Sequence, residues 1–205
     1  MTPARPRSPR GEGRALRDEI LDATEDLLIE TGSEEAVSIR AVAGRVGVTP
    51  PAIYRHFPDK QTLIFEVCSL QFTRLHEHLD AVMAMEAEAT ARLEACGRAY
   101  VEFGLAHPEA YRIMFMGRSD WTPEAYEDEI VADEGPFMAL VEVVADVAAE
   151  LGADREPMAI ATVLWTAMHG ITSLLISKPN FPWPPVEQLV SEVCATHLKG
   201  TFGQE

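Results

Sequence analysis

The stretch SIRAVAGRVGVTPPAIYRHFPDK, residues 38–60, decides the fold of this chain. Ser38 is a good N-cap, because its hydroxyl accepts a backbone N–H left free at the start of a helix. Apolar residues then recur at helical spacing, and Gly47 follows, a residue type that ends many helices in the left-handed conformation. Thr49 and Pro50 are typical of the start of another helix. Two short helices joined by a glycine-containing turn predict a helix-turn-helix, whose second helix enters the DNA major groove.

Helical periodicity continues through nearly all of the chain, punctuated by Pro and Gly and without the sustained alternation of a strand. We expect an all-α protein in which residues 1–13 are a disordered basic arm. Residues 14–60 form a three-helix DNA-binding domain, and residues 61–205 form a larger helical domain for ligand binding and dimerisation. About nine helices are expected, near residues 14–31, 38–46, 49–55, 59–83, 87–106, 108–117, 136–151, 156–177 and 185–199.

The distribution of charge supports DNA binding at one end, although the net charge of the chain is -16. Residues 1–60 hold nine basic and ten acidic side chains, whereas residues 61–205 hold eight and twenty-three. The basic residues of the first part gather in the N-terminal arm and in the helix-turn-helix, where phosphates would be met. The acidic remainder would repel DNA and orient the basic end toward it.

Several pieces of the N-terminal sequence resemble, in register, the tetracycline-repressor (TetR) family of bacterial transcription regulators. They are ILDA at 20–23, LLIETG at 27–32, SIRAVA at 38–43, VGVT at 46–49 and AIYRHF at 52–57, with Asp59, Lys60 and Leu63 behind them. Pro51 departs from the pattern, since the family often has a small residue there. A weaker resemblance covers residues 86–199, where HPEAYRIMF at 107–115 and LWTAMHG at 164–170 look like a C-terminal domain with a Trp-x-x-x-His-Gly motif.

The resemblance implies a set of DNA contacts at the start of the recognition helix and around it. Bases or neighbouring phosphates would be met by Thr49, Pro50, Ala52 and Ile53, although packing inside the small domain is an equal alternative for Ile53. Phosphates would be met by Ser38, Tyr54 and Lys60. His56 either touches a phosphate or caps the turn. The remaining candidates are Arg40, Arg45 and the arginines of the N-terminal arm, for which a solvated tail is as good an interpretation.

The second domain is rich in methionine and aromatic residues, which line adaptable ligand sites but also fill ordinary cores. We expect a pocket for a hydrophobic or aromatic effector among Tyr100, Phe103, Tyr111, Met114, Phe115, Trp121, Met138, Trp165 and His169. His169 or Thr166 would orient the ligand, although a lone histidine on an apolar helix is more often a core residue. The last two long helices, near 156–177 and 185–199, are expected to form a homodimer interface.

Other classes of function find less support in the sequence. No catalytic motif, metal-ligand spacing or cofactor-binding loop appears, so we expect neither an enzyme nor a bound cofactor. We expect that no apolar run reaches the roughly 20 residues of a membrane span. Cys68, Cys96 and Cys194 are interpreted as buried thiols of a cytoplasmic protein. The sequence therefore predicts a ligand-responsive transcription regulator, a repressor acting on a palindromic DNA operator. The alternatives are a helical small-molecule-binding protein without DNA function and a redox-sensing regulator that uses a cysteine.

Overall fold

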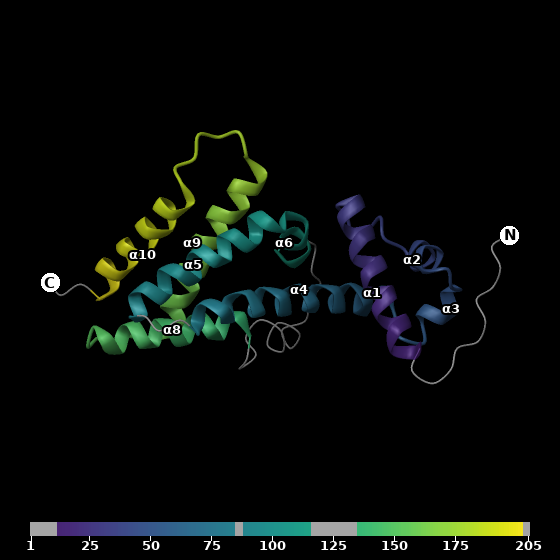
Figure 1. Cartoon of the computed structure of the whole chain (residues 1–205), viewed down its shortest axis with the longest axis horizontal. Coiled ribbons are helices and arrows are strands. Elements are labelled where there is room, and N and C mark those ends of the chain that lie inside the picture. Colours follow the sequence, from purple (N-terminus) through teal and green to yellow (C-terminus); the bar gives the residue numbers. More distant parts are fainter. Residues whose placement is uncertain (1–11, 85–87, 116–134, 203–205) are drawn as a thin grey trace. The chain divides into compact units, whose positions relative to one another are not determined.

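The computed structural model describes residues 12–84, 88–115 and 135–202, and these residues form nine helices (Figure 1). The helices are α1 (Glu12–Thr31), α2 (Ile39–Val46), α3 (Pro50–Ile53), α4 (Lys60–Met83), α5 (Ala89–Ala106), α6 (Pro108–Phe115), α8 (Pro136–Glu150), α9 (Pro157–Ser177) and α10 (Val186–Phe202). Over these residues the prediction of an all-α chain is confirmed. The predicted N-terminal arm lies almost wholly outside the described residues.

The helices gather into two compact units, and α4 contributes to both. The first unit takes in α1, α2, α3, α4 as far as Gln71, and α6 from Glu109 onward. The second takes in α4 from Phe72, together with α5, α8, α9 and α10. The boundary within α4 lies further along the chain than the domain limit expected from the sequence.

The helix-turn-helix forms for the local reasons that the sequence indicates. The Ser38 hydroxyl accepts the backbone N–H of Ala41 at 3.2 Å, which caps α2. Gly47 ends α2 with φ of 78°, a left-handed conformation that a side chain would strain. The Gly47 and Val48 N–H groups both donate to the Ala43 carbonyl, so the turn into α3 is closed by backbone hydrogen bonds. Asp59 then accepts the Thr62 N–H at 2.7 Å and caps α4, which holds the pKa of its carboxyl below the ordinary value.

Fully buried apolar side chains from all four of the first helices hold the first unit together. Ile20 of α1, Val42 of α2, Ile53 of α3 and Leu63 of α4 belong to one core, which Phe57 completes between α3 and α4. Because each helix supplies part of this core, the position of α3 is fixed by α1, α2 and α4 together.

The Arg17 side chain of α1 contacts both the α3–α4 connection and α4. The Arg17 guanidinium binds the Glu66 carboxylate at 2.6 Å and lies over the Phe57 ring, 5.1 Å from its centroid. Arginine is suited to both contacts, because its planar cation stacks on aromatic rings and pairs with carboxylates. The start of α4 is thus tied to α1 by a charged contact outside the apolar core.

In the second unit α5 packs against α8, α9 and α10. Buried residues of this core include Val101 on α5, Val144 on α8, Leu164 on α9 and Val190 on α10. Charged groups at the edge fasten α5 to α8. Both oxygens of Glu150 accept the Ala89 N–H, at 2.9 and 3.0 Å, and so cap α5 from a neighbouring helix.

Helix α9 corrects the expectation that no apolar run of membrane-spanning length is present. By length and composition alone it is long and apolar enough to cross a bilayer, although one such helix is weak evidence, since core helices pass the same test. Only 22% of its most apolar stretch is buried inside the chain. The helix therefore carries apolar surface that the described part of the chain leaves uncovered.

Candidate DNA-binding surface and effector site

The predicted DNA-contacting residues on and beside α3 fall into an exposed group and a buried group. Thr49 is exposed at the N-cap, and Tyr54 is 52% exposed just after the helix. Ala52 and Ile53 face the other way, and Ile53 is fully buried in the core. The burial of Ile53 favours the packing alternative for that residue, and the Ala52 side chain is buried as well, so a base contact by Ala52 stays a prediction that its burial disfavours.

Two exposed residues of the same segment are absent from the predicted set of DNA contacts, although Arg55 is one of the basic residues that gather in the helix-turn-helix. Pro51 and Arg55 are exposed beside Thr49 and Tyr54. The spacing offers a signal: 51, 54 and 55 are three and four apart and share one face of a helical turn. Because Arg55 adds a cation to this face, it belongs with the phosphate-contact candidates.

Arg45, predicted to contact the duplex, is bound to α1. Its guanidinium makes two hydrogen bonds to Glu30, at 2.9 and 2.6 Å, and lies 3.6 Å from Asp26. The hydrogen bonds from Arg45 lower the pKa of the Glu30 carboxyl, and the same pair raises the pKa of Arg45. A phosphate would therefore have to compete with two carboxylates for this side chain. Arg40, at the other end of α2, is exposed next to the Ser38 cap.

Lys60 and His56 are more enclosed than Tyr54. The Lys60 ammonium donates a hydrogen bond to the Glu34 carbonyl in the α1–α2 connection, and its side chain is half-buried. The ring of His56 lies 6.4 Å from that of Phe57, and its backbone N–H donates to the Ile53 carbonyl at 2.9 Å. Lys60 thus has a structural contact in addition to its predicted DNA contact.

Five of the nine predicted effector residues are described residues of the second unit, and three of these belong to one aromatic group. The Tyr100 hydroxyl and His169 Nδ1 are 3.5 Å apart. The Trp165 ring lies 6.1 Å from the His169 ring and 5.8 Å, edge-on, from Phe137. Burial lowers the pKa of His169, so the imidazole is neutral at neutral pH. This group combines apolar rings with a neutral polar pair, the composition of a small-molecule site.

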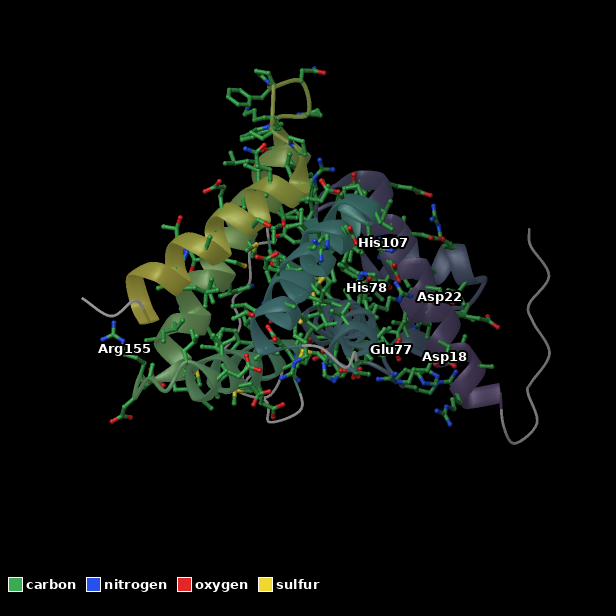
Figure 2. The ribbon with its side chains drawn as sticks, turned by 60° about the vertical axis from the view of Figure 1, so that its left-hand side comes forward. Asp18, Asp22, Glu77, His78, His107 and Arg155 are labelled. Carbon is green, nitrogen blue, oxygen red and sulfur yellow. The ribbon has the colours of Figure 1, made fainter. Side chains whose placement is uncertain are left out.

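The other two residues of the second unit lie at the ends of α5 and α8. Phe103 is buried, and its ring lies 5.9 Å from the His78 ring and 5.1 Å from the His107 ring. Figure 2 labels the two histidines. Met138 is half-buried near the start of α8.

The remaining predicted effector residues either belong to the first unit or lie outside the described residues. Tyr111, Met114 and Phe115 belong to α6 in the first unit, where the Tyr111 and Phe115 rings are 4.8 Å apart. Trp121 lies outside the described residues. The Thr166 side chain is exposed and donates to the Thr162 carbonyl, so the expectation that it orients a ligand beside His169 is not supported.

The cysteines are buried, which disfavours a redox sensor. Burial raises the pKa of Cys96 to about 11 and that of Cys194 to about 12, so both thiols are protonated at neutral pH. Because the thiolate is the reactive form, neither is primed for oxidation. Cys68 is also buried and lies 3.6 Å from the Ile113 carbonyl.

Comparisons with known proteins agree with this arrangement. The family model for bacterial regulatory proteins of the tetR family matches residues 20–67, and the one for the tetracyclin repressor-like C-terminal domain matches residues 93–196. The HTH-type transcriptional regulator YobS of Bacillus subtilis is 26% identical over 164 residues, 79% of each chain.

Solved structures share the fold over nearly the whole chain. A protein of unknown function from Rhodococcus sp. RHA1 is 28% identical, with a TM-score of 0.78 over 97% of this chain and 100% of that one. FadR of Bacillus subtilis, solved in complex with stearoyl-CoA, has a TM-score of 0.72 at 12% identity, over 92% and 99% of the two chains. At that identity the likeness concerns the fold.

An all-α chain with an exposed helix-turn-helix and a separate helical unit defines a class, the ligand-responsive DNA-binding transcription regulators. The chain belongs to the TetR family. Members of this family are soluble DNA-binding regulators, typically dimeric and ligand-binding, and repression is their typical action.

Proposed function

We propose that this chain is a cytoplasmic homodimeric repressor, which a hydrophobic or aromatic small molecule releases from a near-palindromic operator. The observation that carries the proposal is the exposed face of α3 beside the capped start of α2. Thr49, Pro51, Tyr54 and Arg55 are all exposed there, while the opposite face of α3 is buried. A recognition helix needs this division, because its outer face must be free to enter the groove.

Roles on the DNA follow from the chemistry of each side chain. Thr49 and Pro51 lie at the helix start, where base edges are read, and offer a hydroxyl and an apolar surface. The Tyr54 hydroxyl, the Arg55 and Arg40 guanidiniums and the Lys60 ammonium are suited to phosphates, as is the N-terminus of α2 at Ser38. Pro50 and His56 are half-buried and remain secondary candidates.

The dimer is proposed to form through the outward faces of α9 and α10. Val163 and Leu174 are 51% and 46% exposed, and they lie on the same side of α9 as Ala167 and Gly170, at helical spacing. No Asp, Glu, Lys or Arg occurs from Pro157 to Ser177. Leu164, Val190 and Cys194 are buried within the chain, so these three belong to its core and not to the interface.

Gly170 gives separate support to this face. In the middle of a helix, glycine costs about 0.5–1 kcal/mol relative to alanine. Among the described residues, no heavy atom lies within 4 Å of a Cβ built at Gly170 outside its own helix backbone. The described residues therefore give no packing reason for glycine, whereas the close approach of a partner helix does. A two-fold axis there would present two recognition helices to half-sites about 34–36 Å apart.

The effector is proposed to bind in the second unit beside Tyr100, Trp165 and His169. Ring burial would supply the affinity, and the neutral Tyr100–His169 pair would orient a polar group of the ligand. Phe103 and Met138 are further candidates in that unit, and Tyr111, Met114, Phe115 and Trp121 remain predictions from the sequence. Release requires that the effector bind more tightly to one conformation of the dimer than to the other. Helix α4 is the natural route, because it is shared by both units.

Three measurements test the DNA, dimer and effector parts separately, and the first concerns DNA. A duplex selected by the wild-type protein is labelled, and its binding is followed by fluorescence anisotropy. Tyr54→Phe should weaken binding to this duplex and to unrelated DNA alike, because only a phosphate contact is lost. Thr49→Val should instead reduce the preference for the selected duplex.

Gly170→Leu should weaken dimerisation about tenfold or more while the helical content stays unchanged. Gly44→Leu is the matched control, since Gly44 also lies on a helix, in open space.

For the effector, the aromatic dye 8-anilinonaphthalene-1-sulfonate serves as the probe, with Trp165→Ala as the variant. Trp165→Ala should weaken dye binding while the affinity for DNA stays that of the wild type. Dye binding that is unchanged in this folded variant contradicts the proposed effector site.

A further inference from the structure

The connection between α9 and α10, residues 178–185 (KPNFPWPP), displays aromatic side chains instead of covering them. Phe181 is 56% exposed, more than any other large apolar side chain described. Both figures show this segment standing clear of the ends of the two helices that it joins (Figures 1 and 2). We call it the aromatic connection.

The aromatic connection is held in one conformation by its own contacts. The Trp183 indole N–H donates to the Lys178 carbonyl at 2.9 Å, and the Phe181 N–H donates to the same carbonyl at 3.1 Å. The backbone N–H of Trp183 donates to the Phe181 carbonyl at 2.8 Å, and the rings of Phe181 and Trp183 lie 4.4 Å apart. Prolines at 179, 182, 184 and 185 restrict the backbone further. A preorganised apolar surface loses little conformational entropy when a partner covers it.

We propose that the aromatic connection docks on a second copy of this chain and forms the rim of the homodimer interface. The inference rests on the proposed dimer through α9 and α10, and it names the element that extends this interface. The connection follows Ser177 directly, and the exposed Leu174 lies one turn of α9 before it. The uncovered apolar surface of α9 thus continues onto Phe181 without a break in the chain.

Two-fold symmetry makes this docking self-consistent. In an isologous interface each copy presents the same surface, so a rigid connection between two interface helices is used twice. Aromatic residues are enriched at the energetically important positions of such interfaces. Lys178 is the only Lys or Arg from Glu156 to Leu198, whereas the exposed Glu187 and Glu192 lie on α10. A partner's α10 therefore offers the carboxylates that complement Lys178.

The same charges disfavour a membrane as the occupant. Peripheral helices and loops that bind anionic lipid carry clusters of Lys and Arg beside their aromatic residues. Here the aromatic connection carries one lysine within a region of 145 residues that has a net charge of -15. DNA is disfavoured on the same ground. A second, equally acidic copy is acceptable, because this contact is apolar and its one cation has carboxylates to meet.

Sedimentation velocity over a dilution series tests the docking. Phe181→Ala should raise the dimer dissociation constant about tenfold, and Phe181→Ala with Trp183→Ala more than that, with unchanged helical content. Leu151→Ala is the matched control, because Leu151 is an exposed apolar residue of the same unit outside α9 and α10, and it should leave the constant unchanged. Val163→Asp should abolish the dimer.

The outcomes separate this inference from the proposed function. The docking is overturned if Val163→Asp abolishes the dimer but the Phe181 variants change the dimer dissociation constant by less than about twofold. That result would leave the proposed α9–α10 interface in place. A wild-type chain that sediments as a monomer overturns both. The wild-type chain should not co-sediment with phosphatidylcholine–phosphatidylglycerol vesicles. Co-sedimentation that is lost in Phe181→Ala would show that the partner of the aromatic connection is a membrane, and it would overturn the docking on a second copy.

A spectroscopic readout guards against indirect effects of the substitutions. In the Trp121→Phe, Trp165→Phe background, Trp183 is the only tryptophan. Its emission should shift to shorter wavelength, and its quenching by acrylamide should fall, as concentration drives dimer formation. An emission spectrum that stays constant across the dimer transition contradicts the docking.

Discussion

Gly97 on α5 lies against Met168 on α9, so closely that a Cβ added at Gly97 would be 3.1 Å from Met168 Cε. The same Cβ would be 3.1 Å from Val190 Cγ1 on α10. Three helices of the second unit therefore meet at a residue with no side chain. Space and not backbone conformation favours glycine at this position, because an added Cβ would make the Met168 and Val190 side chains shift by a few tenths of an ångström.

Gly97→Leu is expected to lower the free energy of unfolding by ~1–3 kcal/mol, the usual cost of adding volume to a packed core. Urea denaturation followed by circular dichroism measures it. Gly44→Ala, on the open face of α2, is the control and should raise stability by ~0.5–1 kcal/mol, since it removes a helix-interior glycine without a clash. Equal stability of Gly97→Leu and wild type would mean that α5, α9 and α10 do not approach so closely.

Lys60→Ala should weaken binding to all duplexes and reduce the salt slope by about one, because one fewer counterion is released. Since Lys60 also donates to the Glu34 carbonyl, the variant loses a structural contact as well. Lys60→Gln separates the two effects, because its amide still offers a hydrogen-bond donor without the charge. If Lys60→Gln keeps the wild-type salt slope, Lys60 makes no phosphate contact and its role is structural only.

Glu30→Gln should strengthen DNA binding and steepen its salt dependence. The substitution removes a carboxylate that now holds Arg45, so the guanidinium becomes available to a phosphate. Glu35→Gln is the matched control, an exposed acid in the α1–α2 connection. If both variants raise affinity equally, the effect is one of general charge and Arg45 has no contact of its own with DNA.

The pH dependence of stability should contain a contribution from His169. Burial lowers the pKa of this imidazole in the folded chain, so the unfolded chain takes up the proton first as pH falls. Stability is therefore full above the unfolded pKa of about 6.5 and decreases as pH falls through it toward the lower folded pKa. Denaturant unfolding between about pH 8 and about pH 5.5 should show a smaller loss for His169→Gln than for wild type. An identical loss in both would mean that the imidazole is solvated.

Much of the fold could be predicted from the sequence because its signals are local. Ser38, Gly47 and Asp59 act at helix ends through hydrogen bonds and backbone conformation within a few residues. Such features do not depend on the rest of the chain. The apolar spacing of the long helices is equally local, and most predicted limits fall within two residues of those observed.

The direction in which individual side chains face was harder to predict. Ala52 and Ile53 stand beside Thr49 in the sequence, but helical geometry turns them toward the core of α1, α2 and α4. Arg45 reads as a free cation until the fold brings Glu30 within hydrogen-bonding distance, fifteen residues away in the chain. Both outcomes depend on contacts between elements, and such contacts leave no periodic signal in the sequence.

Selection of duplexes from a random pool by the full-length protein tests the central claim most directly. Repeated rounds should enrich a near-palindromic site whose half-sites are centred about one helical turn, roughly 34–36 Å, apart. The same selection with Thr49→Val should change the preferred bases while the two-fold symmetry of the site is kept. A wild-type protein that enriches no duplex sequence, at a salt concentration where it stays folded and dimeric, contradicts the account.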